Sequence, residues 1–272
     1  MWHRKPVVAG TFYPADGDEL RAQIALCLGE AGRADLPGEV VALIAPHAGY
    51  VYSGPIAGHA YRAVEDLNPQ VVIVLAPSHR ARYDGASVIP EGVYETPLGE
   101  VPIDGTIGNR LVQRPAFGFI KEAHTEEHSL EVQVPFLQHV AENFSLVPIV
   151  IGTTELETCR ILARGIIDAI KEDDRKILLV ISTDLSHYHP YDLANALDET
   201  CIEGLKSLDE KTVKEVLSGK AEACGEGPLL TGLMVARALQ GERLEVLHYG
   251  NSGDTAGDKN QVVGYLAAAI VK

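Results

Sequence analysis

Three histidines in this chain of 272 residues each follow a short run of apolar residues. They are His47 after residues 40–45, His79 after residues 71–76, and His187 after residues 177–181. Imidazole binds metal ions and exchanges protons near neutral pH, so side chains repeated at equivalent positions indicate a chemical site. A histidine that follows a strand is also often a hydrogen-bonded structural residue, and this alternative stays open for each of them.

The apolar runs indicate how the histidines come together. They are rich in Val, Ile and Leu and show no polar alternation, which is typical of strands buried on both faces of a parallel sheet. Parallel strands place their carboxyl ends at one edge, where open α/β folds bind ligands. We therefore expect the three histidines to meet there. Pro46 and Pro77 precede His47 and His79, and the fixed proline backbone would limit the movement of both rings.

Asp184 precedes His187 by three residues and adds a carboxylate to the third motif. In one interpretation His187 is an acid or base near neutral pH, and Asp184 orients His187 or a bound water. In the other, Asp184 caps the helix that follows, and His187 is an exposed residue at the helix start. The spacing favours neither interpretation.

Cys224 lies just before a predicted helix that begins near Leu229. The partial positive charge of a helix start lowers the pKa of a thiol, and the thiolate binds metal or acts as a nucleophile. The alternative is a small residue in a tight turn. The other three cysteines fall in helical patterns and are expected to be core or partly exposed thiols, and no CxxC pair indicates a disulfide framework or zinc knuckle.

Three further residues are candidates for the wall of a cleft. His128 opens a predicted helix, in which Ser129 could act as the cap and the early glutamates would suit the helix dipole. His128 is therefore either an ordinary residue of the helix start or part of the wall of a cleft. Tyr50 and Tyr52 follow His47 and fit a pocket wall as well as they fit the core.

The elements that position these residues alternate between strands and helices. Helices are predicted at 16–31, 55–67, 107–114, 129–143, 156–171, 190–205, 210–217 and 229–239, and strands at 40–45, 71–76, 146–151, 177–181 and 244–249, with a last apolar run at 262–271. Residues 82–104 are predicted to contain a small hairpin over the sheet edge, and 250–259 a Gly-rich loop. No linker or repeat interrupts the pattern. We therefore expect a single α/β domain over 1–272, with a mostly parallel central sheet flanked by helices.

The composition excludes several classes of protein. The net charge of −15 and pI near 5.0 argue against general binding of nucleic acid or anionic membranes, because the attraction to phosphate would have the wrong sign. No run approaches the roughly 20 apolar residues of a membrane helix, and the start does not resemble a signal peptide. We expect a cytoplasmic protein.

At six ordered motifs the chain resembles the Memo family, named for a mediator of ErbB2-driven cell motility, whose microbial members are called AmmeMemoRadiSam system protein B. The motifs are residues 10–14, 45–50, 77–79, 127–131, 182–187 and 223–225. The resemblance implies a fold similar to class III extradiol dioxygenases, which hold non-haem Fe(II) with two histidines and a carboxylate. It also implies His47, His79 and Cys224 as metal ligands, with Asp184 and His187 beside them.

One difference from the dioxygenases bears on the metal and its chemistry. A thiolate stands where those enzymes use a carboxylate, and this softer ligand shifts the preference toward copper while leaving iron open. Our first hypothesis is a mononuclear site for one iron or copper ion per chain, with redox or oxygenase-type chemistry. The second is a peptide- or protein-binding module that retains a dioxygenase-like cleft without turnover.

The resemblance also bears on partners. A small molecule or a peptide is expected in the cleft. The microbial family name points to association with radical-SAM and AMMECR-like proteins. His128 and Tyr50 are the residues that we expect at the wall of the cleft, because each lies directly beside one of the matching histidine motifs.

Overall fold

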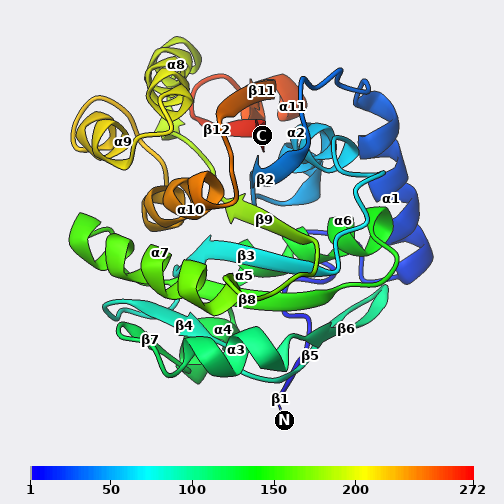
Figure 1. The fold of residues 1–272 in the computed structure, drawn as a ribbon. Coiled ribbons are helices and arrows are strands. Elements are labelled where there is room, and N and C mark those ends of the chain that lie inside the picture. Colours follow the sequence, from blue (N-terminus) through cyan, green and yellow to red (C-terminus); the bar gives the residue numbers. More distant parts are fainter. Residues whose placement is uncertain (1) are drawn as a thin grey trace.

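Four parallel strands form the centre of the protein, in the spatial order β8, β3, β9, β2. Their bounds are β2 (Val40–Ala45), β3 (Val71–Pro77), β8 (Ser145–Ile151) and β9 (Ile177–Ser182). The computed structural model describes residues 2–272 and confirms that the three runs before the histidine motifs are parallel neighbours. Figure 1 shows these strands between two layers of helices.

Further strands extend this centre on both sides into a mixed, mostly parallel sheet. On one side β2 pairs antiparallel with β12, which also pairs with β10 and β11. On the other side lie the hairpin β5–β6, the parallel strand β1 beside β5, and the short strands β4 and β7. The bounds are β1 (Trp2–Arg4), β4 (Ala86–Val88), β5 (Gly92–Thr96), β6 (Gly99–Ile103), β7 (Phe117–Gly118), β10 (His187–His189), β11 (Arg243–Asn251) and β12 (Val262–Val271).

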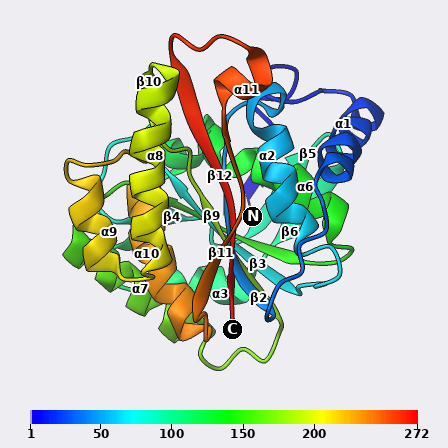
Figure 2. The ribbon, with the colours of Figure 1, turned by 90° about the horizontal axis from the view of Figure 1, so that it is seen from above.

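Helices cover both faces of the sheet (Figures 1 and 2). One face carries α1 (Gly17–Glu30), α2 (Tyr50–Arg62) and α6 (Gln133–Val140). The other carries α7 (Leu156–Ile170), α8 (Tyr191–Lys206), α9 (Glu210–Leu217) and α10 (Glu226–Ala238). The shorter helices are α3 (Gly105–Leu111), α4 (Lys121–Thr125), α5 (His128–Glu131) and α11 (Ser252–Ala256). None of the helices within residues 2–272 has both the length and the apolar character needed to cross a bilayer.

Alternate residues of the central strands pack into two separate apolar cores. In β2, Leu43 and Ala45 belong to the core beneath α1, α2 and α6, and Ala42 and Ile44 to the core beneath α7 and α10. All four have no exposed surface. Burial on both faces explains why the strands show no polar alternation, and each fully buried large aliphatic side chain stabilises the fold by about 1.5–3 kcal/mol.

Helix α2 begins earlier than the sequence predicts. A start near Pro55 was expected, because proline favours the first turn of a helix. The structure starts the helix at Tyr50, whose backbone N–H donates to the carbonyl of Phe12 at 2.7 Å. This long-range hydrogen bond satisfies an N–H that a first turn leaves free, and no local pattern reveals it.

The helix predicted over 129–143 is divided into α5 and α6. Pro135 lies in the first turn of α6 and has no N–H to donate to the carbonyl of Glu131, which favours a break at this point. The break keeps His128 in a separate short helix at the edge of the sheet. His128 and Glu127 can therefore face the strand ends without following the axis of α6.

Two segments after His187 also differ from the prediction. The chain was expected to be mostly helical there, but β10 forms because it pairs with β12 in the tertiary fold. The predicted Gly-rich loop contains α11, which starts with a capping box formed by Asn251 and Asp254. Residues 82–104 do contain a hairpin, but it is formed by β5 and β6, and it extends the sheet instead of covering its edge.

A buried ion pair fastens the N-terminal segment beneath the strand ends. Arg4 and Glu131 are almost fully buried and form a salt bridge. Glu131 also accepts the backbone N–H groups of Val7 and Val8 and the hydroxyl of Tyr13. Arg4 donates to the carbonyl oxygen of Glu127 at 2.7 Å. The pair thus links the first residues of the chain to the segment that carries Glu127 and His128.

We predict that Glu131→Gln lowers the free energy of unfolding by about 3–5 kcal/mol, because it leaves the charge of Arg4 buried without a partner. The measurement is equilibrium unfolding in urea. Arg33→Met is the matched control, since Arg33 pairs with Asp66 on the exposed surface and should cost less than about 1 kcal/mol. Equal losses in the two variants would contradict this account of the N-terminal segment.

Candidate metal centre

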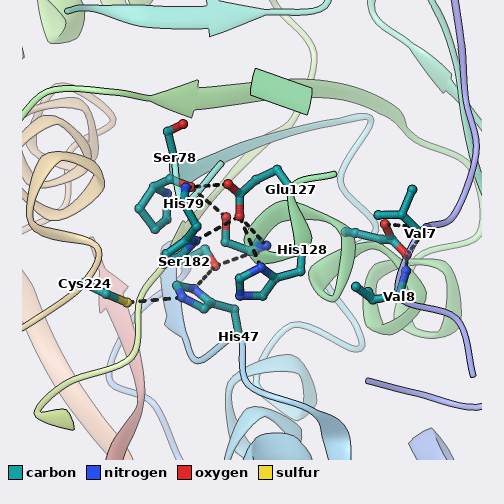
Figure 3. A network of polar contacts seen from close by, with 12 residues as sticks. Val7, Val8, His47, Ser78, His79, Glu127, His128, Ser182 and Cys224 are labelled. Atoms are coloured by element: carbon teal, nitrogen blue, oxygen red, sulfur yellow. Dashed lines mark hydrogen bonds and ion pairs between the residues drawn. The ribbon is translucent and has the colours of Figure 1, made fainter. Parts of the chain in front are cut away.

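Strand ends and one helix start place three ligand side chains together. His47 lies two residues after β2, His79 two residues after β3, and Cys224 two residues before α10. One ligand atom from each of the three lies within 4.8 Å of the other two. Figure 3 shows these side chains meeting in one network of polar contacts. The structure therefore brings together the three residues that were expected to bind metal.

Ser182, the last residue of β9, fixes the tautomer of His47. Its hydroxyl is 2.7 Å from the carbonyl oxygen of Ser129, to which it must donate. The same oxygen lies 2.9 Å from Nδ1 of His47 and 2.8 Å from Nε2 of Gln133, so it accepts from both. His47 is therefore protonated on Nδ1 and keeps the lone pair on Nε2. Burial, with the neighbouring histidines, lowers the pKa of His47 well below its usual value, which keeps the ring neutral.

Glu127 fixes the tautomer of His79 in the same way. The Glu127 carboxylate accepts the backbone N–H of His79 at 2.5 Å and Nδ1 of the ring at 2.9 Å, and it also accepts the N–H of Ser129. Burial opposes ionisation of Glu127, but the contacts with His79 and Ser129 outweigh it and lower the pKa to about 2. A carboxylate behind a histidine orients the ring and raises the basicity of its outer nitrogen, as in known metal sites.

Backbone contacts hold Cys224 against His47. The sulfur lies 3.2 Å from Nε2 of His47 and accepts the N–H of Asp184 at 3.3 Å. The N–H of Cys224 donates in return to the carbonyl of Asp184. Gly225 permits this approach, because a Cβ there would lie 2.5 Å from the Cβ of Thr183.

The expected depression of the Cys224 pKa by the helix start is not found. Burial and the nearby Asp184 carboxylate raise the pKa of the thiol instead. The sequence argument considered only the dipole of α10, whereas the desolvation of a thiolate in this packed site is the larger effect. In the protein without metal, the thiol is positioned to donate to the unprotonated Nε2 of His47.

Asp184 and His187 are close to this group but do not act as a hydrogen-bonded pair. Asp184 accepts the backbone N–H of His47 at 2.7 Å, and burial raises its pKa to about 6. Nδ1 of His187 donates to the carbonyl of Leu185 at 2.8 Å, which leaves Nε2 as the acceptor. Within residues 2–272, no hydrogen bond joins Asp184 to His187. The expectation that Asp184 orients His187 is therefore corrected, because Leu185 does so. Helix capping is also excluded, since His187 begins β10.

His128 adds a third imidazole. Its ring centre is 4.7 Å from that of His79 and 5.6 Å from that of His47. Its Nδ1 is buried 3.4 Å from Oε1 of Glu127 but forms no hydrogen bond, and burial lowers the pKa of the ring to about 4. His79, Glu127 and His128 form a second group whose ligand atoms lie within 4.8 Å of one another.

A cavity of about 470 Å³ opens beside these residues. It is lined by Phe12, Ala48, Gly49, Tyr52, His128, Asp184, His187, Tyr188, Ser252, Gln261, Val263 and Tyr265. His128 lies on its wall as expected, but Tyr50 does not. Tyr50 is buried, packs against Phe136 and donates its hydroxyl to the carbonyl of Val132. Tyr52, two residues later and on the opposite side of α2, lines the cavity instead.

Sequence reasoning missed the residues that support the ligands. Ser182 and Glu127 lie within the matching motifs, but the sequence predicts only a helix-start role for Glu127 and no role behind His47 for Ser182. Glu127 is indeed the N-cap of α5, in place of Ser129, whose hydroxyl donates to the carbonyl of Pro77. A metal-binding histidine needs an acceptor for its second ring nitrogen, which fixes the tautomer. Looking in the matching motifs for a side chain that could accept this hydrogen bond could have identified both residues.

Comparison with known proteins shows the family of the chain. The family model described as Memo-like protein matches residues 4–269. The chain belongs to this family. A MEMO1 family protein of Methanopyrus kandleri is 39% identical, with 97% of both chains covered. One from Methanothermobacter thermautotrophicus is 38% identical over 96% of this chain and 98% of its own.

A solved structure shares the fold. An uncharacterised protein from Escherichia coli K12 matches with a TM-score of 0.54 and 18% identity, covering 85% of this chain and 100% of its own. The likeness concerns the arrangement of strands and helices alone. It shows that this sheet and its helical layers occur in a chain of low sequence identity, and the site itself rests on the residues described above.

We predict that ¹⁵N NMR of metal-free protein at pH 8 shows both His47 and His79 protonated on Nδ1. Ser182→Ala should change the tautomer signal of His47 alone, because it removes the acceptor behind that ring. Glu127→Gln should change the signal of His79. Protonation on Nε2 in the wild-type protein would contradict the hydrogen-bond assignment.

Proposed function

We propose that the protein binds one iron or copper ion through His47, His79 and Cys224 and uses it in redox or oxygenase-type chemistry. The observation that carries the proposal is the convergence of one ring nitrogen from each of His47 and His79 and the sulfur of Cys224, all within 4.8 Å of one another. Family membership supports a common site but not a specific reaction.

The donor set fits such an ion. Two imidazoles and a thiolate are ligands that copper and iron accept, and the sulfur makes the set softer than two histidines with a carboxylate. The hydrogen bonds from Nδ1 of both rings to Ser182 and Glu127 are the outer contacts that metal-bound histidines require. When bound, the ion would supply one-electron redox chemistry and Lewis acidity.

The remaining residues suit proton handling and positioning. His187 offers Nε2 as an acceptor because Nδ1 donates to Leu185, and its side chain lines the cavity. It can therefore accept a proton from a molecule bound there. The carboxylate of Asp184 accepts the backbone N–H of His47, and the backbone N–H of Asp184 donates to the sulfur of Cys224. Asp184 therefore positions two of the three ligands.

The occupant of the cavity is proposed to be a small molecule. A peptide in a cleft without turnover is the alternative, and the experiment below separates the two. Association with radical-SAM and AMMECR-like proteins also remains a proposal, supported by the microbial name of the family.

The test starts with metal content. We predict about one iron or copper ion per chain after anaerobic loading and removal of excess metal, measured by plasma mass spectrometry, and loss of that ion in His47→Ala and Cys224→Ala. Glu127→Gln should weaken binding by about 10- to 100-fold. His59→Ala is the matched control, since His59 stacks on His248 away from this group. Unchanged stoichiometry in His47→Ala would contradict the assignment.

Turnover is then measured on the same preparations. Loaded protein should consume oxygen with catechol-type substrates, and His187→Ala should slow consumption by about 10²- to 10⁴-fold without changing metal content. His189→Ala is the control, because His189 instead pairs with Glu222. If the metal-loaded protein consumes no oxygen, the proposed turnover is contradicted, and the result favours the alternative of a peptide- or protein-binding module.

A further inference from the structure

The cavity beside the metal ligands is large compared with a single aromatic ring. Its volume is about 470 Å³, roughly three times the 150 Å³ of an engineered protein cavity that holds benzene. It also lies within the range of natural small-molecule sites, about 300–1,000 Å³. A ligand that fills it therefore has more than one ring, or one ring with a sizeable substituent.

Four aromatic side chains from separate parts of the chain line this cavity. They are Phe12, Tyr52, Tyr188 and Tyr265. The ring of Phe12 also lies 4.9 Å from the ring of His128. Aromatic faces brought together in this way favour flat aromatic ligands, which stack on them or meet them edge to face.

The charges around the cavity argue against an anionic ligand. No Lys or Arg is among the lining residues that the structure describes, and the lining carboxyl group is Asp184. A carboxylate or phosphate would leave water here without a side-chain cation to receive it. The part of the ligand that lies away from the metal ligands should therefore be uncharged.

Tyr188 has the most unusual position of these residues. It lies in β10 between His187 and His189, where the pairing with β12 shifts register. Its backbone φ is +61°, a left-handed conformation that is a genuine outlier for a bulky residue. Its side chain lines the cavity although 69% of the residue is exposed, and its ring meets His187 edge-on at 5.8 Å.

Tyr188 adopts this conformation where the pairing of β10 with β12 is irregular, and the conformation costs a tyrosine free energy. Strained backbone of this kind concentrates at ligand-binding sites, where it directs a side chain toward the ligand. Glycine would adopt the same φ without strain. A tyrosine at this place therefore indicates that its ring has a role.

We propose that Tyr188 is a specificity residue that stacks on an uncharged, multi-ring aromatic ligand in this cavity. The proposal rests on the proposed function only in taking the cavity as the substrate site, because the stacking surface consists of protein side chains. A peptide would have to insert one aromatic side chain, which fills much less of the volume.

The test uses three probes of matched size on full-length, metal-free protein. They are 2-naphthol, its 6-sulfonate and decahydro-2-naphthol, titrated by calorimetry. We expect one site for 2-naphthol. The sulfonate should bind at least about 10-fold more weakly because its charge finds no cation. The saturated analogue should bind about 2- to 10-fold more weakly because it cannot stack.

Variants separate stacking from backbone strain. Tyr188→Gly should be as stable as the wild type or more stable, yet bind 2-naphthol about 2- to 10-fold more weakly, whereas Tyr188→Phe should bind it normally. Gln240→Gly is the control, because Gln240 also has a positive φ, of 70°, but does not line the cavity. It should leave 2-naphthol binding unchanged.

Unchanged affinity in Tyr188→Gly, equal binding of the sulfonate, or no binding of 2-naphthol would overturn the proposal. So would binding of an aromatic peptide in preference to 2-naphthol. Metal content is measured in parallel. If the probes bind in the expected order but the protein holds no metal, the metal function alone is refuted. If the protein holds metal normally but the probes do not bind in that order, the stacking proposal alone is refuted.

Discussion

The site depends on the acceptor that lies behind each imidazole. A neutral imidazole has one protonated and one free nitrogen, and the free nitrogen is the one that can bind a metal. Ser182 accepts from Nδ1 of His47, and the ionised Glu127 accepts from Nδ1 of His79. Both rings therefore keep an unprotonated Nε2, and that of His47 lies 3.2 Å from the sulfur of Cys224. Without these two acceptors, the three side chains would be near one another but would lack a defined set of donor atoms.

The rest of the fold holds these acceptors in place. Ser182 is part of the central strand β9, and its hydroxyl is fixed by its bond to Ser129. Arg4 donates to the backbone carbonyl of Glu127 and pairs with the buried Glu131. This ion pair therefore holds the segment that carries Glu127. The apolar layers on both faces of the sheet thus support a small polar network at its edge, in which nearly every buried donor has an acceptor.

Much of this arrangement could be predicted from the sequence. Continuous apolar runs indicated parallel strands, and the resemblance to the Memo family implied that Cys224 joins His47 and His79. The parts that could not be predicted depend on long-range contacts. The start of α2 is set by Phe12, and β10 exists because β12 lies beside it. The side of α2 that faces the cavity decides that Tyr52 and not Tyr50 reaches it. The raised pKa of Cys224 has the same origin, since burial is not a local property.

The most direct test of the central claim is anomalous diffraction at the iron and copper edges, on crystals of protein purified without chelators. The account predicts one anomalous peak per chain, bounded by Nε2 of His47, Nε2 of His79 and Sγ of Cys224. A peak between His79, Glu127 and His128, or one outside this network, would contradict it.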